Sequence, residues 1–202
     1  MNTLVDIFTT DCIALNCPAR TRAESFSIAG DLFEKKLGIP SSSVVHFLNT
    51  REDLSSTALG SGVAIPHGTV SGIDMPVACF IKLAEAIDFY APDGIKISIL
   101  IFLLLPEKAV QGHIQILSSL AQLLLDNDQR QNLLSIHEPE KICQLLNLVI
   151  DFSEILQTQD LQNNFKQSIK SSNQYILSYL AEWAILEVSR KKDGEIVSSS
   201  KR

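Results

Sequence analysis

A twenty-residue stretch, residues 49–68, carries the side chains of this sequence that are best suited to chemistry. It contains Arg51, then a Gly-x-Gly turn at residues 60–62, and it ends in the letters AIPHG, which place His67 between a proline and a glycine. The proline fixes its own φ at about −65° and the glycine adds no bulk, so a stiff, open backbone is expected to present the imidazole. With an ordinary pKa of about 6.5, a neutral histidine keeps one ring nitrogen with a lone pair and is a good phosphoryl acceptor at neutral pH.

Arg51 is the second residue for which we predict a role. A guanidinium that folds back toward His67 can form paired hydrogen bonds to phosphoryl oxygens and spread their charge. Without wider context, a lone histidine in a turn with glycine and proline is more often an ordinary loop residue. The turn at residues 60–62 could also offer backbone N–H groups to a phosphoryl oxygen, but it lacks the Gly-Lys-Ser/Thr ending of a nucleotide-binding loop, which argues against ATP.

A metal site built on His67 and His113 is disfavoured. The sequence offers no third histidine or paired cysteine at ligand spacing, and its carboxylates are scattered. Four other polar residues receive no chemical role and are interpreted as surface, boundary or turn residues: His46, His137, Asp88 and Asp93.

The composition limits the class of protein. The chain has 202 residues, of which 46% are hydrophobic and 20% charged, so one full domain with an appendage is expected and wholesale disorder is excluded. The net charge of −6 argues against nonspecific nucleic-acid binding. The apolar run at residues 97–105 is shorter than the about 20 residues of a membrane span, and the N-terminus lacks the basic start of a signal peptide. A cytoplasmic protein with reduced, structural cysteines is therefore expected.

The hydrophobic pattern predicts helices around a central group of strands. A capping box at Thr21 and Glu24, with Gly38 and Pro40 as stop signals, predicts a helix over residues 22–37. Further helices are predicted from just after residues 41–43 to about Arg51, from Ala109 to Leu124, over 128–135 and over 139–149, and strands over 63–65, 77–83 and 97–105. The expected fold is α/β, a single domain with a mixed central β-sheet flanked by helices, plus a C-terminal helical extension.

The extension is predicted to start after residue 150. Residues 151–170 are rich in Gln, Asn and Ser and are interpreted as a connector, residues 171–190 carry an amphipathic helical stripe, and a disordered basic tail follows. The stripe favours a helix that packs on its own domain or on a second copy of the chain, which would make a homodimer. A DNA-binding helix-turn-helix is disfavoured, because no pair of short helices joined by a tight turn is apparent.

Four phrases of the sequence occur together in an order that is typical of one family. They are TRED, STALGSGVAIPHG, IDFYAPDGIKISILIFLLLPE and GHIQILSSLAQLL. Over roughly residues 4–148 the sequence resembles the phosphotransferase-system enzyme IIA domains of the fructose/mannitol type, most closely their nitrogen-regulatory branch.

The resemblance implies a phosphoryl carrier. His67 would accept the phosphoryl group from the phosphocarrier HPr or its nitrogen-system counterpart, His113 would support it from beside the acceptor, and Arg51 would stabilise the phosphoryl oxygens. No cofactor or metal is expected. Since no IIB-type domain is apparent, a regulatory charge switch acting on a protein partner is favoured. Two alternatives stay open: a sugar-specific IIA component that passes phosphate to a IIB subunit for transport, and a non-catalytic interaction module.

Overall fold

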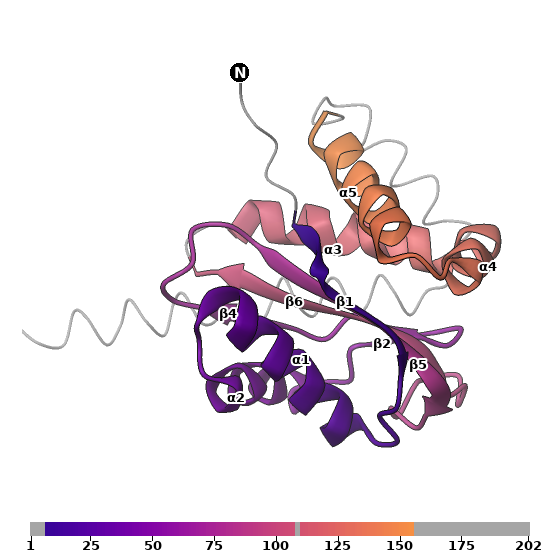
Figure 1. Cartoon of the computed structure of the whole chain (residues 1–202), viewed down its shortest axis with the longest axis horizontal. Helices are drawn as coiled ribbons and strands as arrows, with labels where there is room; N and C mark the ends of the chain where they lie inside the picture. Colours follow the sequence, from indigo (N-terminus) through magenta and orange to yellow (C-terminus); the bar gives the residue numbers. More distant parts are fainter. Residues whose placement is uncertain (1–6, 108–109, 156–202) are drawn as a thin grey trace, which may run out of the picture. The chain divides into compact units, whose positions relative to one another are not determined.

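The computed structural model describes residues 7–107 and 110–155, which form a mixed β-sheet with helices on both faces (Figure 1). Helices α1 and α2 cover one face, and α3, α4 and α5 cover the other. The strands are β1 (Phe8–Cys17), β2 (Ala58–Gly60), β3 (Val63–Ala64), β4 (His67–Val70), β5 (Val77–Ile87) and β6 (Ile97–Pro106), and the helices are α1 (Arg22–Leu37), α2 (Ser41–Glu52), α3 (Val110–Leu125), α4 (Asn127–Ser135) and α5 (Pro139–Ile155). This arrangement confirms the predicted fold class.

Strand β6 lies at the centre of the sheet. The strand order is β1-β5-β6-β3-β2, with β5 antiparallel to β6 and both β3 and β4 parallel to it. Leu103 of β6 pairs with Ala78 of β5 on one side and with His67 of β4 on the other. Strand β4 therefore pairs with the same side of β6 as β3 does, further along β6. Pro66 has no N–H for the ladder, but its carbonyl accepts a hydrogen bond from Leu103 N at 2.9 Å. Residues 63–70 are therefore one strand interrupted at Pro66, and His67 opens its second half.

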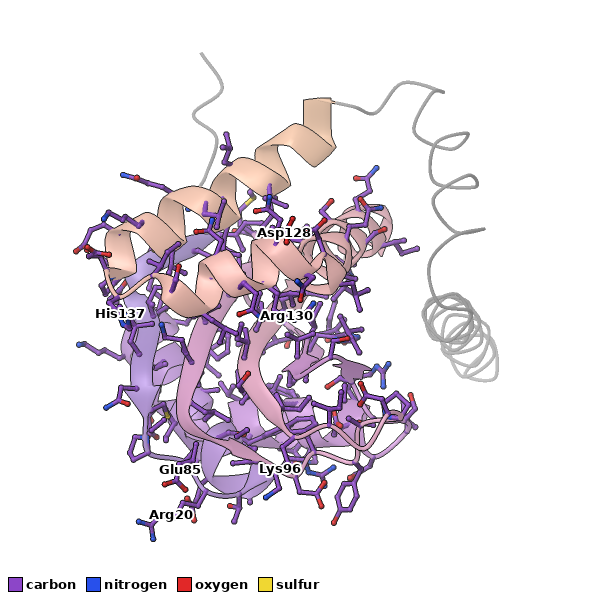
Figure 2. The ribbon with its side chains drawn as sticks, turned by 90° about the vertical axis from the view of Figure 1, so that its right-hand side faces the viewer. Arg20, Glu85, Lys96, Asp128, Arg130 and His137 are labelled. Carbon is purple, nitrogen blue, oxygen red and sulfur yellow. The ribbon has the colours of Figure 1, made fainter. Side chains whose placement is uncertain are left out.

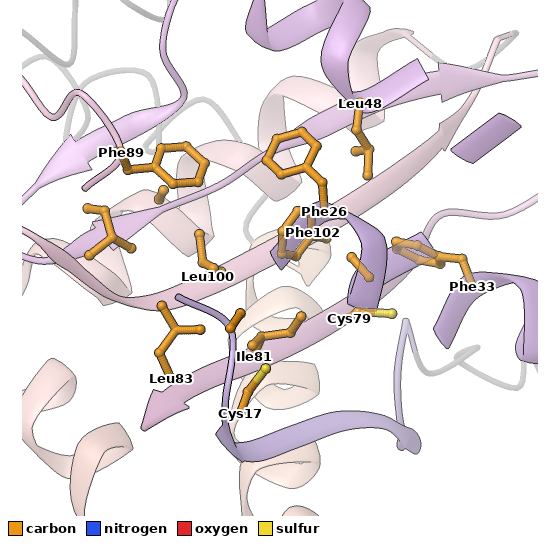
Figure 3. Close-up of a cluster of buried hydrophobic side chains, with 14 of the residues drawn as sticks. Cys17, Phe26, Phe33, Leu48, Cys79, Ile81, Leu83, Phe89, Leu100 and Phe102 are labelled. Atoms are coloured by element: carbon orange, nitrogen blue, oxygen red, sulfur yellow. The ribbon is translucent and has the colours of Figure 1, made fainter. Parts of the chain in front are cut away.

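Strand β6 is buried on both faces, which explains why its sequence is apolar apart from Ser98. Leu100 and Phe102 belong to the core under α1 and α2, where the Phe102 ring meets Phe26 edge-on at 5.3 Å between centroids (Figure 3). Ile99 and Ile101 alternate with them, so they point to the other face, and they are also fully buried. The run at residues 97–105 is thus a strand, as predicted, and not a short buried helix.

Helix α1 has the predicted bounds and most of the predicted caps. Thr21 Oγ1 accepts a hydrogen bond from Glu24 N at 3.1 Å, and Gly38 ends the helix in the left-handed conformation at φ 72°. The other half of the predicted capping box differs, because Glu24 Oε2 accepts from Arg20 N at 2.8 Å. The cap therefore also fixes the residue that leads into the helix.

Helix α2 begins slightly earlier than predicted, at Ser41. Its N-cap position is Pro40, which offers no capping side chain, and the Ser41 N–H instead donates to Glu34 Oε2 of α1 at 3.2 Å. A carboxylate from a neighbouring helix thus replaces the local cap that serine-rich sequence suggested. The predicted C-terminal position of Arg51 is confirmed, since α2 ends at Glu52.

Three strands were not predicted: β1, β2 and β4. Strand β1 pairs in parallel with β5, but irregularities between Phe8 and Ile13 and between Ala14 and Cys17 break the alternation of buried and exposed residues on which a sequence prediction depends. Strands β2 and β4 are short and lie among the glycines and proline that suggested turns.

Helix α5 runs to Ile155, past the predicted boundary at residue 150, because no glycine or proline interrupts it. The side-chain amide of Asn147 joins it to β1: its Oδ1 accepts from Phe8 N at 3.0 Å and its Nδ2 donates to Phe8 O at 2.8 Å. The first compact unit of the chain ends at Glu154. Apart from this last turn of α5, the predicted connector, amphipathic helix and tail lie outside the described residues. Within the described ranges, no helix has the length and apolar character to cross a membrane.

Candidate functional site

His67 lies at the start of β4, and its side chain is buried rather than openly presented as the sequence suggested. The residue is only 2% exposed. The expectation was wrong about the role of Gly68: a Cβ there would lie 3.1 Å from the Phe47 carbonyl oxygen of α2. The missing side chain therefore lets α2 pack closely against β4, and this packing helps to enclose the imidazole.

A single hydrogen bond determines which ring nitrogen of His67 carries the proton. Nδ1 lies 2.8 Å from the carbonyl oxygen of Ile65. A carbonyl oxygen can only accept, so in the neutral ring Nδ1 holds the proton and Nε2 holds the lone pair. The interruption at Pro66 places this carbonyl two residues before the histidine. The ring nitrogen that carries the lone pair is therefore Nε2.

Electrostatics keep the His67 ring neutral. Burial, the positive charge of Arg51 and a smaller contribution from His113 together lower the pKa of His67 to about 3, although the hydrogen bond to Ile65 opposes the shift. The pKa is thus far from the ordinary value that the sequence argument assumed. The ring of His67 is therefore unprotonated over the whole neutral pH range.

Arg51 lies in the last turn of α2 and is 7% exposed. It is four residues after Phe47, so the two share the helix face that packs on β4. Its Nη1 donates to the carbonyl oxygen of Ser55 at 3.1 Å and to Ser55 Oγ at 3.3 Å. Since its charge also lowers the pKa of His67, the structure brings the two predicted residues together.

His113 lies in the first turns of α3 and is fully buried. Burial lowers the pKa of His113, whereas the carbonyl of Pro106, at the end of β6, acts in the opposite direction. Among the described residues neither of its ring nitrogens makes a hydrogen bond of good geometry. The neutral imidazole of His113 also interacts electrostatically with His67. Its ring N–H can therefore donate a hydrogen bond to an oxygen of a group bound at this site.

The Gly-x-Gly turn does not offer all of its N–H groups to a phosphoryl oxygen. Ser61 N donates to Asp93 Oδ2 at 2.6 Å. Asp93 Oδ1 also accepts from Ile95 N, and Asp88 Oδ1 accepts from Tyr90 N, each at 3.0 Å. Both aspartates therefore build local turns, which confirms their predicted structural role.

The two remaining histidines, His46 and His137, are exposed, in keeping with the surface or boundary role predicted for them. Figure 2 shows His137 beside the layer of helices α3–α5, with Arg20, Glu85 and Lys96 at the opposite end of the sheet. In the part of the chain that the structure describes, no three His, Cys, Asp or Glu side chains come together as a candidate metal site.

A family comparison identifies the kind of protein that carries this histidine. Residues 6–149 match the family described as the phosphoenolpyruvate-dependent sugar phosphotransferase system, EIIA 2. The chain belongs to this family. It is therefore a phosphotransferase-system IIA protein, a class of phosphoryl carrier that is phosphorylated on histidine, as the sequence resemblance implied.

Known IIA proteins of two kinds are similar to this one. A nitrogen regulatory protein of Pseudomonas aeruginosa is 31% identical over 144 residues, which cover 71% of this chain and 94% of that protein. The crystal structure of the nitrogen regulatory protein IIA-Ntr from Neisseria meningitidis has a TM-score of 0.67 and 34% identity, covering 69% of this chain and 96% of the other. The structure of IIA mannitol from Escherichia coli has a TM-score of 0.57 and 25% identity, with coverages of 69% and 98%.

Two buried polar residues of this IIA protein were not predicted, Glu52 and Thr57. The side chain of Glu52 at the end of α2 accepts hydrogen bonds from the backbone and hydroxyl groups of Thr57. One feature of the sequence points to Glu52. An acidic residue in the last turn of a helix interacts unfavourably with the helix dipole, so its presence requires another explanation.

The lowered pKa of His67 predicts a loss of stability in mild acid. Between the folded pKa of about 3 and the unfolded value of 6.5, the unfolded chain binds more protons, so the free energy of unfolding falls as the pH decreases. At about 1.4 kcal/mol per pKa unit, His67 alone accounts for about 2 kcal/mol between pH 7 and pH 5. Denaturant unfolding of the wild type and of His67→Gln at both pH values measures this, and equal losses in the two proteins would contradict it.

Proposed function

We propose that Nε2 of His67 accepts a phosphoryl group from HPr or its nitrogen-system counterpart, and that the phosphorylated protein is a regulatory switch. The observation that carries the proposal is the hydrogen bond from Nδ1 of His67 to the carbonyl of Ile65, because it leaves the lone pair on Nε2. Family membership supplies the class of reaction, and this bond supplies the accepting atom.

The transfer is a displacement at phosphorus. The Nε2 lone pair of His67 attacks the phosphorus of the donor's phosphohistidine, a new N–P bond forms while the donor's N–P bond breaks, and the donor imidazole leaves with the electron pair. The His67 ring gains positive charge as the bond forms, and the Ile65 carbonyl, which accepts from Nδ1–H, stabilises that charge. The phosphoryl oxygens are stabilised by the charge of Arg51 and by a hydrogen bond from His113.

The output we favour is regulatory. The chain is more similar to nitrogen regulatory proteins than to IIA mannitol. A phosphoryl group adds about 1.5 to 2 negative charges at neutral pH, which is enough to create or prevent contact with a protein partner. The second candidate is a sugar-specific IIA component, which passes phosphate to a IIB subunit. The similarity of the chain to IIA mannitol supports it.

A reconstituted relay tests both candidates. The full chain is incubated with phosphoenolpyruvate, enzyme I and labelled HPr, or with the nitrogen-system counterparts of both proteins, and then with a fructose- or mannitol-type IIB subunit. We expect stoichiometric, acid-labile phosphate on residue 67 and slow or absent transfer to IIB. Rapid transfer to IIB would favour the transport function, and no labelling by either donor would leave the protein as a non-catalytic interaction module.

We also propose that phosphoryl acceptance is separable from the part of the chain after residue 150. All three residues to which we assign a role in transfer lie between residues 51 and 113. Residues 171–190 are, in this proposal, a docking or dimerisation segment.

We also propose a cytoplasmic location. It agrees with the four cysteines, all of which are free thiols.

A further inference from the structure

We infer that Glu52 is a positioning residue for phosphoryl transfer. Through Thr57 and Ile65 it holds the ring of His67 in its reactive tautomer, and it closes the loop that contains the hydrogen-bond partner of Arg51. This inference rests on the proposed function of His67, but the contacts that support it are properties of the unphosphorylated protein.

The side chain of Glu52 is fully buried, and its carboxyl group has few partners. Its two oxygens lie 3.1 and 3.2 Å from Thr57 N, and Oε2 accepts from Thr57 Oγ1 at 2.6 Å. Arg22 Nη1 of α1 is 3.9 Å from Oε1, which is a loose ion pair. Burial raises the pKa of Glu52, against the opposing effect of the Thr57 hydrogen bonds. The carboxyl group therefore accepts hydrogen bonds mainly from one residue, Thr57.

From Thr57 the hydrogen bonds continue to the acceptor histidine. The carbonyl of Thr57 accepts a hydrogen bond from Ile65 N at 3.1 Å, next to the pairing of Ala58 with Ala64 between β2 and β3. The carbonyl of the same Ile65 accepts from Nδ1 of His67 at 2.8 Å. Successive hydrogen bonds, joined through the backbone of Thr57 and of Ile65, thus connect the Glu52 carboxyl group with the ring nitrogen of His67.

Arg51, the residue before Glu52, is bound to the same loop. Arg51 Nη1 donates to both oxygens of Ser55, which lies between α2 and β2. The hydrogen bonds that Thr57 donates to Glu52 close this loop two residues further on. Loss of the Glu52 carboxyl group would therefore make Ser55, the hydrogen-bond partner of Arg51, less well fixed. It would also weaken the contact of Ile65 with the His67 ring.

A purely structural role is the competing explanation, in which Glu52 only satisfies the backbone at the end of α2. The two explanations predict different results when the hydrogen bonds to Thr57 are weakened. A structural role predicts reduced stability with an unchanged rate per folded molecule. A positioning role also predicts a changed His67 ring and slower transfer, because a small displacement of an aligned reacting group can cost about a hundredfold in rate.

The test uses the full chain with Glu52→Ala, Glu52→Gln, Thr57→Val and the Gln/Val double variant. Two readouts are taken: single-turnover transfer from the phosphorylated donor, and ¹⁵N NMR of the histidine rings without any donor. We expect Glu52→Ala to slow transfer about tenfold to a hundredfold and to move His67 from the Nδ1–H form toward a mixture of tautomers. Glu52→Gln keeps one accepting oxygen and should be milder. Because both residues act in one series of bonds, the double variant should be no slower than the slower single variant.

Asn147→Ala is the matched control. It removes a buried polar side chain that bonds to Phe8 on the other face of the sheet, so it should lower stability without changing either readout. The inference would be overturned if folded Glu52→Ala had the wild-type transfer rate and ring signals. It would also be overturned if Asn147→Ala changed both readouts as much as Glu52→Ala does. Should Glu52→Ala not fold, Glu52→Gln and Thr57→Val decide by the same criteria. If the wild type is never phosphorylated at residue 67, the proposed function fails, whereas the ring signals still test the positioning.

Discussion

Replacing His67 by alanine or glutamine should abolish phosphoryl acceptance in the reconstituted transfer assay. The reason is that, in the proposed mechanism, the attacking lone pair is the one on Nε2 of His67, since Nδ1 donates to Ile65. Burial and the charge of Arg51 hold the pKa of this residue at about 3, so the ring is neutral and reactive at pH 7. Labelling with phosphorylated donor, followed by mass spectrometry of the intact protein, measures the loss.

The same experiment contains its controls. His46 and His137 are exposed and have no assigned role, so His46→Gln and His137→Gln should be labelled like the wild type. The more demanding comparison is with His113, whose neutral ring is also buried and is electrostatically coupled to His67. Phosphate on residue 113 in the wild type, or persistent stoichiometric labelling of His67→Ala, would refute the assignment of the acceptor.

The sequence points to His67 as the candidate acceptor because its signals are local. The letters AIPHG place the histidine, and cap and stop residues fixed the bounds of α1 to the residue. The buried β6 was recognisable from its continuous apolar run. By contrast, the pKa of His67 depends on burial by elements far apart in the sequence, including the close contact of α2 with Gly68. No local pattern contains that information.

The contacts that position the site were hidden for the same reason. Glu52 lies within the phrase TRED, yet its partner Thr57 is buried only because the loop after α2 folds back. Strand β1 was missed because its two irregularities remove the alternating pattern. The start of α2 is held by Glu34 from another helix. In each case a contact outside the local segment decided the structure, and propensity was the weaker influence.

Replacing Arg51 by alanine should slow phosphoryl transfer about a hundredfold and at the same time raise the pKa of His67. Both effects come from one charge. A guanidinium beside the imidazole repels a proton, which is why Arg51 lowers the pKa of His67, but it attracts the phosphoryl oxygens, which carry negative charge. The residue therefore favours the phosphoryl group over the proton at the same nitrogen. A general loss of structure would also slow transfer and raise this pKa, because burial makes the largest contribution to its low value. In a folded Arg51→Ala protein, the pKa of His67 should therefore rise but stay below the unfolded value of 6.5.

Single-turnover kinetics and an NMR titration of the His67 ring measure the rate and the pKa on the same samples. Arg51→Lys keeps the positive charge but loses the fork of N–H donors that can contact two oxygens at once. It should therefore keep the pKa of His67 low while restoring only part of the rate. His113→Ala is the companion variant: it should also slow transfer, because it removes a hydrogen-bond donor for the phosphoryl group. A wild-type rate or an unchanged pKa of His67 in Arg51→Ala would show that the charge of Arg51 does not act on the reacting nitrogen, and a wild-type rate in His113→Ala would remove His113 from the proposed transfer.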